Sequence, residues 1–166
     1  FKGEIKGNML IHPKTGKRLK EQKNKFFTDA FTDPANYEYV LQQFPQLKIN
    51  LAHFGGYDEW QKYLSPSFEN TGATWFEKIC SLIRNYPNVY ADISYTLFSD
   101  DLFSLLKLSL EDHSLKNKIL YGSDFYMVEQ QISERQFLTN VRGFIGEDHF
   151  RLIAQQNPLS FLNKFI

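Results

Sequence analysis

The sequence predicts an α/β fold in which helices cover a parallel sheet. Three short apolar runs alternate with segments of helical periodicity, and no hairpin signal joins one run to the next. Each run ends in a polar side chain. The first run lies in the stretch Leu47–Gly56 and ends at His53. The second, Asn88–Ser94, ends at Ser94, and the third, Lys118–Asp124, ends at Asp124. Gly55 and Gly56 directly follow His53 and its neighbour, which favours a sharp turn after the first strand.

Composition limits the classes of protein that fit. A chain of 166 residues with 42% apolar residues suits one globular domain, 1–166. The formal net charge is zero, which argues against nucleic acid as a partner. No apolar run approaches the ~18 residues needed to span a membrane. The single cysteine, Cys80, excludes an internal disulfide framework and favours a cytoplasmic, reducing compartment. Its apolar surroundings predict a buried structural thiol.

Residues 1–30 have the least regular pattern and predict an irregular loop or insertion. Met9–Pro13 fits a short strand ending in His12, and it fits equally well one side of a hairpin that turns at Thr15–Gly16.

Helices are predicted between and after the strands. Asp33 suits a helix cap and Pro34 the first helical position. Apolar residues at helical spacing, ended by proline or glycine, predict the remaining helices. Residues 57–74 predict a long connection ordered by packing. The predicted helices cover residues 34–44, 75–83, 102–110, 132–145 and 150–165, the last interrupted at Asn157–Pro158.

The strand ends are where we expect a site. Ligands of parallel sheets meet the C-terminal ends of the strands. His53 and Asp124 end two strands with one strand between them, and in a closed barrel both side chains would face one place. An imidazole and a carboxylate suit Zn, Mn or Fe, and they suit proton transfer with a bound water equally well. The alternative is structural: His53 bonded to a backbone carbonyl and Asp124 capping the following turn.

Asp92 and Ser94 lie two residues apart and therefore on one face of their strand. Hydrogen bonding between neighbouring strands is the favoured interpretation, with substrate contact as the alternative.

Leu51–Gly56, preceded by Phe44–Ile49, resembles the sixth-strand signature of the amidohydrolase superfamily. Ile119–Asp124 is similar to the eighth-strand signature, and Asn157–Pro158 to the closing helix. The most similar branch is the metal-dependent hydrolases related to aminocarboxymuconate-semialdehyde decarboxylase. The resemblance covers residues 33–165.

The resemblance implies a (β/α)8 TIM-barrel fold, of which this chain covers strands six to eight. It implies that Asp124 binds a divalent metal, zinc before manganese or iron, and helps to deprotonate water. It implies that His53 polarises the substrate or the water, or binds the metal. Relatives hydrolyse amides, esters or lactones, and some decarboxylate carboxylic acids.

Two departures from the family pattern lead to further expectations. The family's first strand carries a His-x-His pair, which this chain lacks, and a whole barrel needs about 250 residues. We therefore expect the isolated chain to be inactive, and to need a missing N-terminal half or a self-associated partner chain. His12 has suitable spacing for the fifth-strand metal ligand, although its neighbours favour an inserted loop.

The small-molecule substrate is expected to contact Trp60 and Tyr126, near His53 and Asp124 respectively; surface packing is the alternative for Trp60. A non-catalytic α/β fragment that serves assembly is the alternative function. A phosphate-binding doubly wound sheet using Gly55–Gly56 has weaker support, because no phosphate-binding fingerprint is present.

Overall fold

The structure is a computed structural model that describes residues 10–11, 18–19, 24–65 and 72–163. The chain divides into two units, Phe1–Asp33 and Pro34–Ile166. In the first unit, β1 (Leu10–Ile11) pairs antiparallel with β2 (Arg18–Leu19), as a hairpin requires. Helix α1 (Asn24–Thr32) follows, so the prediction of an irregular segment up to residue 30 is wrong from Asn24 onward. His12 lies outside the described residues.

The second unit begins with a turn and helix α2 (Asn36–Gln43). The helix confirms the prediction from residue spacing, but it begins later than the predicted cap at Asp33. Pro34 and Ala35 form a turn instead, in which the amide of Tyr37 donates to the carbonyl of Pro34 at 3.0 Å. The fixed φ of proline suits such a turn as well as it suits a helix start.

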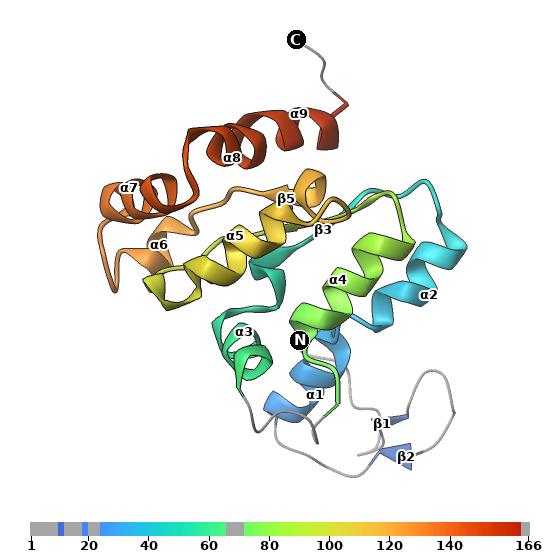
Figure 1. Cartoon of the computed structure of the whole chain (residues 1–166). Helices are drawn as coiled ribbons and strands as arrows, with labels where there is room; N and C mark the ends of the chain where they lie inside the picture. The colour runs from blue at the N-terminus through green and yellow to red at the C-terminus, as the bar shows by residue number, and fades with distance from the viewer. Residues whose placement is uncertain (1–9, 12–17, 20–23, 66–71, 164–166) are drawn as a thin grey trace. The chain divides into compact units, whose positions relative to one another are not determined.

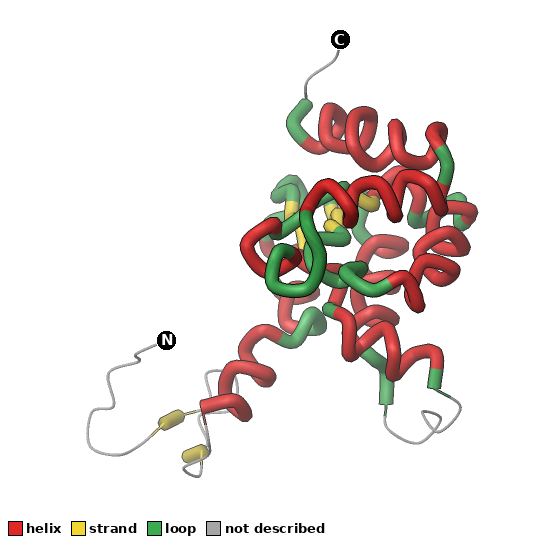
Figure 2. The backbone as a smooth tube through the Cα atoms, turned by 90° about the vertical axis from the view of Figure 1, so that its left-hand side faces the viewer, coloured by secondary structure: helices red, strands yellow, loops and turns green. Residues whose placement is uncertain are grey.

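A three-stranded parallel sheet forms the centre of the second unit, and helices surround it (Figures 1 and 2). Its order is β3 (Ile49–Leu51), β4 (Val89–Asp92) and β5 (Ile119–Leu120). Both pairings are parallel, with Asn50 opposite Tyr90 and Ala91 opposite Ile119. The predicted parallel sheet is therefore confirmed, and β4, which ends at Asp92, two residues before Ser94, lies between the other two.

Two helices connect β3 to β4. Helix α3 (Tyr57–Leu64) corrects the expectation of a long connection from residue 57, because its buried residue Trp60 anchors a helical turn against the core. Helix α4 (Trp75–Asn85) confirms the predicted amphipathic helix. Thr74 and Glu77 form a reciprocal capping box at its start.

After β4, the short helix η4 (Asp100–Leu102) leads into α5 (Phe103–Glu111), and η5 (Lys116–Lys118) precedes β5. Helix α6 (Phe125–Val128), which periodicity did not indicate, follows Asp124. Helix α7 (Glu134–Ile145) is followed by Gly146 as its C-cap, as predicted, but it begins two residues later than predicted, where Ser133 caps it. Helices α5 and α7 pack against each other and contribute buried apolar side chains to the core.

The chain then forms α8 (Glu147–Arg151), the π-helical segment η6 (Leu152–Gln156) and α9 (Asn157–Phe161). Asn157 is buried, and its side-chain amide donates to the carbonyls of Lys116 (2.8 Å) and Ile119 (2.7 Å). The side chain therefore fastens the last helix to the start of β5.

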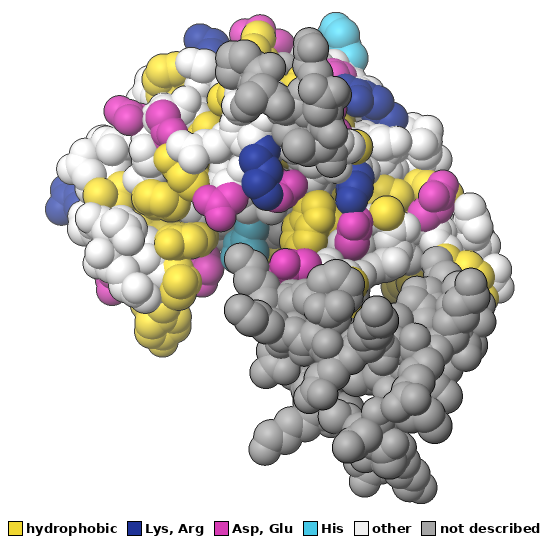
Figure 3. All heavy atoms as spheres, turned by 90° about the horizontal axis from the view of Figure 1, so that it is seen from below, with side chains coloured by type: hydrophobic (Ala, Val, Ile, Leu, Met, Phe, Trp, Pro, Cys, Tyr) yellow, Lys and Arg dark blue, Asp and Glu magenta, His cyan; other side chains and the backbone are white. Residues whose placement is uncertain are grey.

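The core fills the space between the sheet and the helices of the second unit. Its largest fully buried side chains are Trp60, Phe54, Phe137, Leu41, Ile79, Ile93, Leu97, Leu102, Leu106, Leu110, Ile119 and Ile153. In the described part of the chain, no helix has both the length and the apolar character needed to cross a bilayer. On the face shown in Figure 3, acidic and basic side chains are interspersed rather than separated by sign.

Candidate active site at the strand ends

A residue with a left-handed backbone follows each strand of the sheet. His53 after β3 has a φ of 61°, Tyr95 after β4 has 56°, and Asp124 after β5 has 49°. Each such conformation is unfavourable for a residue with a Cβ, and it persists only where the surrounding structure holds it. Strain of this kind gathers at functional sites more often than elsewhere. The three strand ends are therefore the candidate functional site of the sheet.

The turn after β3 holds His53 at the sheet edge. Helix η2 (Ala52–Gly55) follows β3 without a break, and Phe54 also has a positive φ, of 43°. Gly55 has a φ of 94°, and a Cβ there would come within 3.0 Å of the backbone nitrogen of Phe76. Only glycine fits this position, because both the backbone angle and the contact exclude a side chain. The predicted sharp turn after His53 is confirmed.

The imidazole of His53 contacts the end of β4. Its Nδ1 lies 2.9 Å from the carbonyl oxygen of Ser94 and 3.0 Å from the Oγ of the same residue. The ring is partly buried, and the Ser94 side chain is buried. The hydrogen bond to a backbone carbonyl that the structural interpretation of His53 predicts is therefore present. This hydrogen bond uses Nδ1, one of the two ring nitrogens.

Asp92 joins β3 to β4 through both of its carboxylate oxygens. Oδ1 accepts hydrogen bonds from the backbone amides of His53 and Ser94, each at 3.1 Å, and from the Ser94 hydroxyl. Oδ2 accepts from the side-chain amide of Asn50 at 2.6 Å. The expectation of hydrogen bonding between strands by Asp92 and Ser94 is confirmed, and the role is larger than expected because one carboxylate holds the backbone of His53.

The end of β5 lies against the end of β4. A Cβ on Gly122 would come within 3.1 Å of the Ser94 Cβ, and the amide of Tyr95 lies 3.4 Å from the carbonyl of Ser123. Asp124 follows, partly buried, at the start of α6. Its side chain makes no capping hydrogen bond to that helix, so the structural alternative predicted for Asp124 is not what holds it.

Trp60 has a different place from the one expected. Its side chain is fully buried, its ring packs against Phe54 and Phe76, and its indole N–H donates to the carbonyl of Phe54 at 2.8 Å. A side chain with no exposed surface offers nothing to a substrate here, so the expected substrate contact of Trp60 is corrected. Trp60 instead supports the turn that carries His53.

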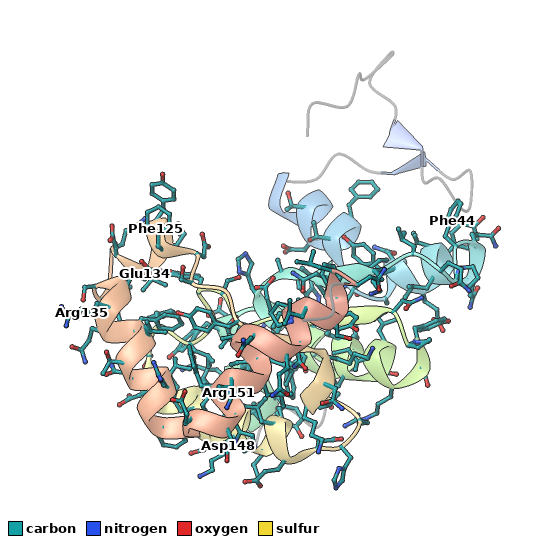
Figure 4. All side chains as sticks on the ribbon, turned by 90° about the horizontal axis from the view of Figure 1, so that it is seen from above. Phe44, Phe125, Glu134, Arg135, Asp148 and Arg151 are labelled. Atoms are coloured by element: carbon teal, nitrogen blue, oxygen red, sulfur yellow. The ribbon has the colours of Figure 1, made fainter. Side chains whose placement is uncertain are left out.

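Tyr126 lies on α6, two residues after Asp124, with 75% of its surface exposed. Its ring packs on that of Phe125, with centroids 3.9 Å apart. Figure 4 places Phe125 at the same end of the unit as Glu134 and Arg135, where α7 begins. These exposed aromatic rings beside Asp124 remain a candidate surface for substrate.

A metal ion needs more ligands than the described residues bring together. Among them, no group of three or more His, Cys, Asp or Glu side chains could hold a metal. Catalytic zinc takes three protein ligands as a rule. His53 and Asp124 alone do not make such a set.

Cys80 and two of the surface cavities, both lined by described residues, lie outside this site. Burial raises the pKa of the Cys80 thiol to about 12, as expected for a structural cysteine. Two surface cavities of about 350 and 440 Å³ are lined by residues of the outer helices and their ends, and His53, Ser94 and Asp124 line neither.

Sequence reasoning did not find the central place of Asp92. The only signal was the spacing of Asp92 and Ser94 on one strand face, which does not reveal that one carboxylate meets the backbone of a residue on the neighbouring strand.

Comparison with known proteins gives a match at the level of the family. No curated protein and no solved structure matches the chain. A family model described as Amidohydrolase matches residues 25–164, which include β3, β4 and β5 and the polar residues at their ends. A match over most of the chain shows the family, and this chain belongs to the amidohydrolases.

Proposed function

We propose that the chain carries the sixth to eighth strands of a (β/α)8 hydrolase barrel and supplies His53 and Asp124 to its active site. One observation carries the proposal. In the order β3-β4-β5, the end of β4 touches His53 on one side and Gly122, two residues before Asp124, on the other. The carboxyl ends of parallel strands are where barrel enzymes hold their catalytic groups.

The proposed reaction is hydrolysis of a small amide, ester or lactone: water adds to the carbonyl carbon, the acyl C–N or C–O bond breaks, and the leaving nitrogen or oxygen takes up a proton. Decarboxylation of a carboxylic acid is the variant chemistry. Two groups are suited to accept a proton from the attacking water. One is the second ring nitrogen of His53, and the other is the carboxylate of Asp124, which makes no capping hydrogen bond to α6. We propose the branch related to aminocarboxymuconate-semialdehyde decarboxylase, because the Leu51–Gly56 and Ile119–Asp124 stretches resemble its strand signatures. The exposed rings of Phe125 and Tyr126 form the proposed wall for the substrate.

Amidohydrolases commonly use divalent metals, and zinc is the metal we propose, with manganese or iron as alternatives. Asp124 is the ligand that we propose among the described residues. The remaining ligands would come from an N-terminal half with a His-x-His pair, or from a partner chain. The gene sequence upstream of the codon for Phe1 is the first place to look for that pair.

The test compares variants in the protein that contains this chain together with its N-terminal half. His53→Ala and Asp124→Asn should each lower turnover at least about tenfold, as expected on loss of a positioned acid–base group. His113→Ala and Asp148→Asn are matched controls, since both side chains are exposed on the helical periphery, and they should retain full turnover. Wild-type rates in both site variants would end the catalytic proposal.

The alternative function is a non-catalytic fragment that serves assembly. One observation favours it: the described residues bring together no set of three metal ligands. If the protein hydrolyses no member of a panel of amides, esters and lactones with zinc, manganese or iron added, yet forms a stable complex with the N-terminal half, assembly is the function.

A further inference from the structure

We infer that Asp92 and Ser94 are positioning residues that hold neutral His53 as the tautomer protonated on Nδ1. The nitrogen that carries the free lone pair is then Nε2. This inference rests on the proposed function for its catalytic meaning, while its structural content can be tested without turnover. It follows from the donors and acceptors around one ring nitrogen.

The carbonyl of Ser94 lies 2.9 Å from Nδ1 of His53. A carbonyl oxygen can only accept a hydrogen bond. In this contact Nδ1 must therefore be the donor, and it must carry the proton.

The hydroxyl of Ser94 leads to the same conclusion. Its Oγ lies 3.0 Å from Nδ1, and it also contacts Oδ1 of Asp92. A hydroxyl has one hydrogen to donate. Because that hydrogen goes to the carboxylate, Oγ can meet Nδ1 only as an acceptor. Both polar atoms of Ser94 thus require the proton on Nδ1.

Asp92 keeps the hydroxyl in this orientation. Oδ1 faces two backbone amides as well as the hydroxyl, and Oδ2 faces the amide of Asn50. With donors aimed at both oxygens, neither oxygen is placed to donate a proton back to Ser94. The carboxylate therefore sets the direction of the Ser94 hydrogen bond, and through it the proton on His53.

The backbone of His53 is held by the same group. Asp92 accepts from the amide of His53 at 3.1 Å, and the hydroxyl of Thr96 donates to its carbonyl. These contacts fasten a residue whose φ is 61°. Ring and backbone are thus held from β4 and the residues that follow it. Among the described residues, the ring is engaged through Nδ1, which leaves Nε2 to a proton or a ligand.

Long-range ¹H–¹⁵N NMR of histidine-labelled protein tests the inference, at a pH where His53 is neutral. Nε2 couples to both carbon-bound ring protons, whereas Nδ1 couples strongly to one, so the unprotonated nitrogen can be identified. The His53→Ala spectrum assigns the signals. We expect the unprotonated nitrogen to be Nε2, and an Nε2–H tautomer would overturn the inference.

Variants separate the contributions of the two residues. Ser94→Ala removes the hydroxyl but keeps the backbone carbonyl, so Nδ1–H should persist. Asp92→Ala frees the hydroxyl to donate to Nδ1, so a mixture of tautomers is expected. The Asp92→Ala/Ser94→Ala double variant has no hydroxyl and should return to Nδ1–H. Ser104→Ala, at an exposed site on α5, is the control and should match wild type. A pure Nδ1–H tautomer in folded Asp92→Ala would show that Asp92 does not direct the proton.

Turnover distinguishes failure of this inference from failure of the proposed function. In the protein with its N-terminal half, Asp92→Ala should lower kcat at least about tenfold with little change in KM. The reason is that His53 molecules protonated on Nε2 cannot accept a proton through that nitrogen, and this affects the chemical step rather than substrate binding. Full turnover in His53→Ala together with an Nδ1–H tautomer in wild type would remove the proposed function and leave the geometry intact. If Asp92→Ala does not fold, the wild-type and Ser94→Ala spectra still decide the tautomer.

Discussion

Gly122 lies against Ser94 across the β4–β5 pair, so closely that a Cβ on Gly122 would come within 3.1 Å of the Ser94 Cβ. The backbone of Gly122 thus lies against the side chain of Ser94, and Ser94 in turn meets His53. Absence of a side chain at Gly122 thus contributes to the position of the imidazole on the far side of β4.

Gly122→Ala should therefore disturb the site and the fold together. We expect a loss of about 1–3 kcal/mol in the free energy of unfolding, because the added methyl overpacks the β4–β5 contact. Urea denaturation measures the loss, and the His53 ring signals should shift in NMR spectra. Gly143→Ala is the control. Nothing lies within 4 Å of a Cβ there, and alanine in the interior of α7 should stabilise the protein by about 0.5–1 kcal/mol. Unchanged stability and unchanged His53 signals in Gly122→Ala would contradict the packing argument.

Trp60 is predicted to be a stability residue. Trp60→Ala should cost about 3–5 kcal/mol, as expected for loss of a fully buried aromatic side chain. Trp60→Phe keeps a ring but loses the hydrogen bond to the Phe54 carbonyl, and should cost less. Phe44→Ala, at a residue with 63% of its surface exposed, should change stability by no more than about 0.5 kcal/mol. If Trp60→Ala kept wild-type stability in thermal and urea denaturation, its place in the core would be wrong.

The contribution of Asn157 to the free energy of unfolding is predicted to come from its side-chain amide nitrogen. Asn157→Ala leaves the carbonyls of Lys116 and Ile119 without their donor, which should cost about 1–3 kcal/mol. Asn157→Asp should cost more above the carboxyl pKa, because a buried negative charge then faces two carbonyl oxygens. Lowering the pH should restore part of that stability, since a protonated acid can donate one hydrogen bond. Asn140→Ala, at an exposed position on α7, is the control. Equal unfolding free energies for the Ala and Asp variants across pH would refute this account.

Cys80 is predicted to be unreactive in the native protein. Burial raises its thiol pKa to about 12, so almost no thiolate is present near pH 8. A thiol reagent should label the chain rapidly in denaturant and negligibly under native conditions. The unfolded thiol ionises from about pH 8.5, whereas the folded thiol stays protonated, so this group lowers stability as the pH rises from there toward 12. Cys80→Ala should lose that part of the pH dependence, and fast native labelling would show that the thiol is not buried.

The cap of α4 tests a local prediction. Thr74→Ala removes the side-chain acceptor of the capping box and should cost about 1 kcal/mol in the free energy of unfolding. Thr74→Ser keeps the acceptor and should stay close to wild type. Equal losses in the two variants, measured by urea denaturation, would show that burial of the Thr74 methyl group matters rather than the cap.

The sequence by itself determined the alternation of strands and helices, the parallel sheet and the glycine turn after His53. These features depend on apolar periodicity, prolines and glycines, which act through local backbone preferences. It also brought out His53 and Asp124 as the polar ends of two strands. Helix α3 was not predicted from the sequence, because the burial of its one fully buried residue, Trp60, depends on packing against the core.

Only the tertiary structure decided how the strand ends are held. The left-handed backbone of His53, Tyr95 and Asp124 is uncommon for a residue with a Cβ, so the identity of these residues does not by itself fix this conformation. Likewise, the Asp92 carboxylate meets the backbone amide of His53 because β3 and β4 lie side by side, although 39 positions separate the two residues. Hydrogen bonds between strands depend on which atoms come together in space, and that is settled when the sheet forms.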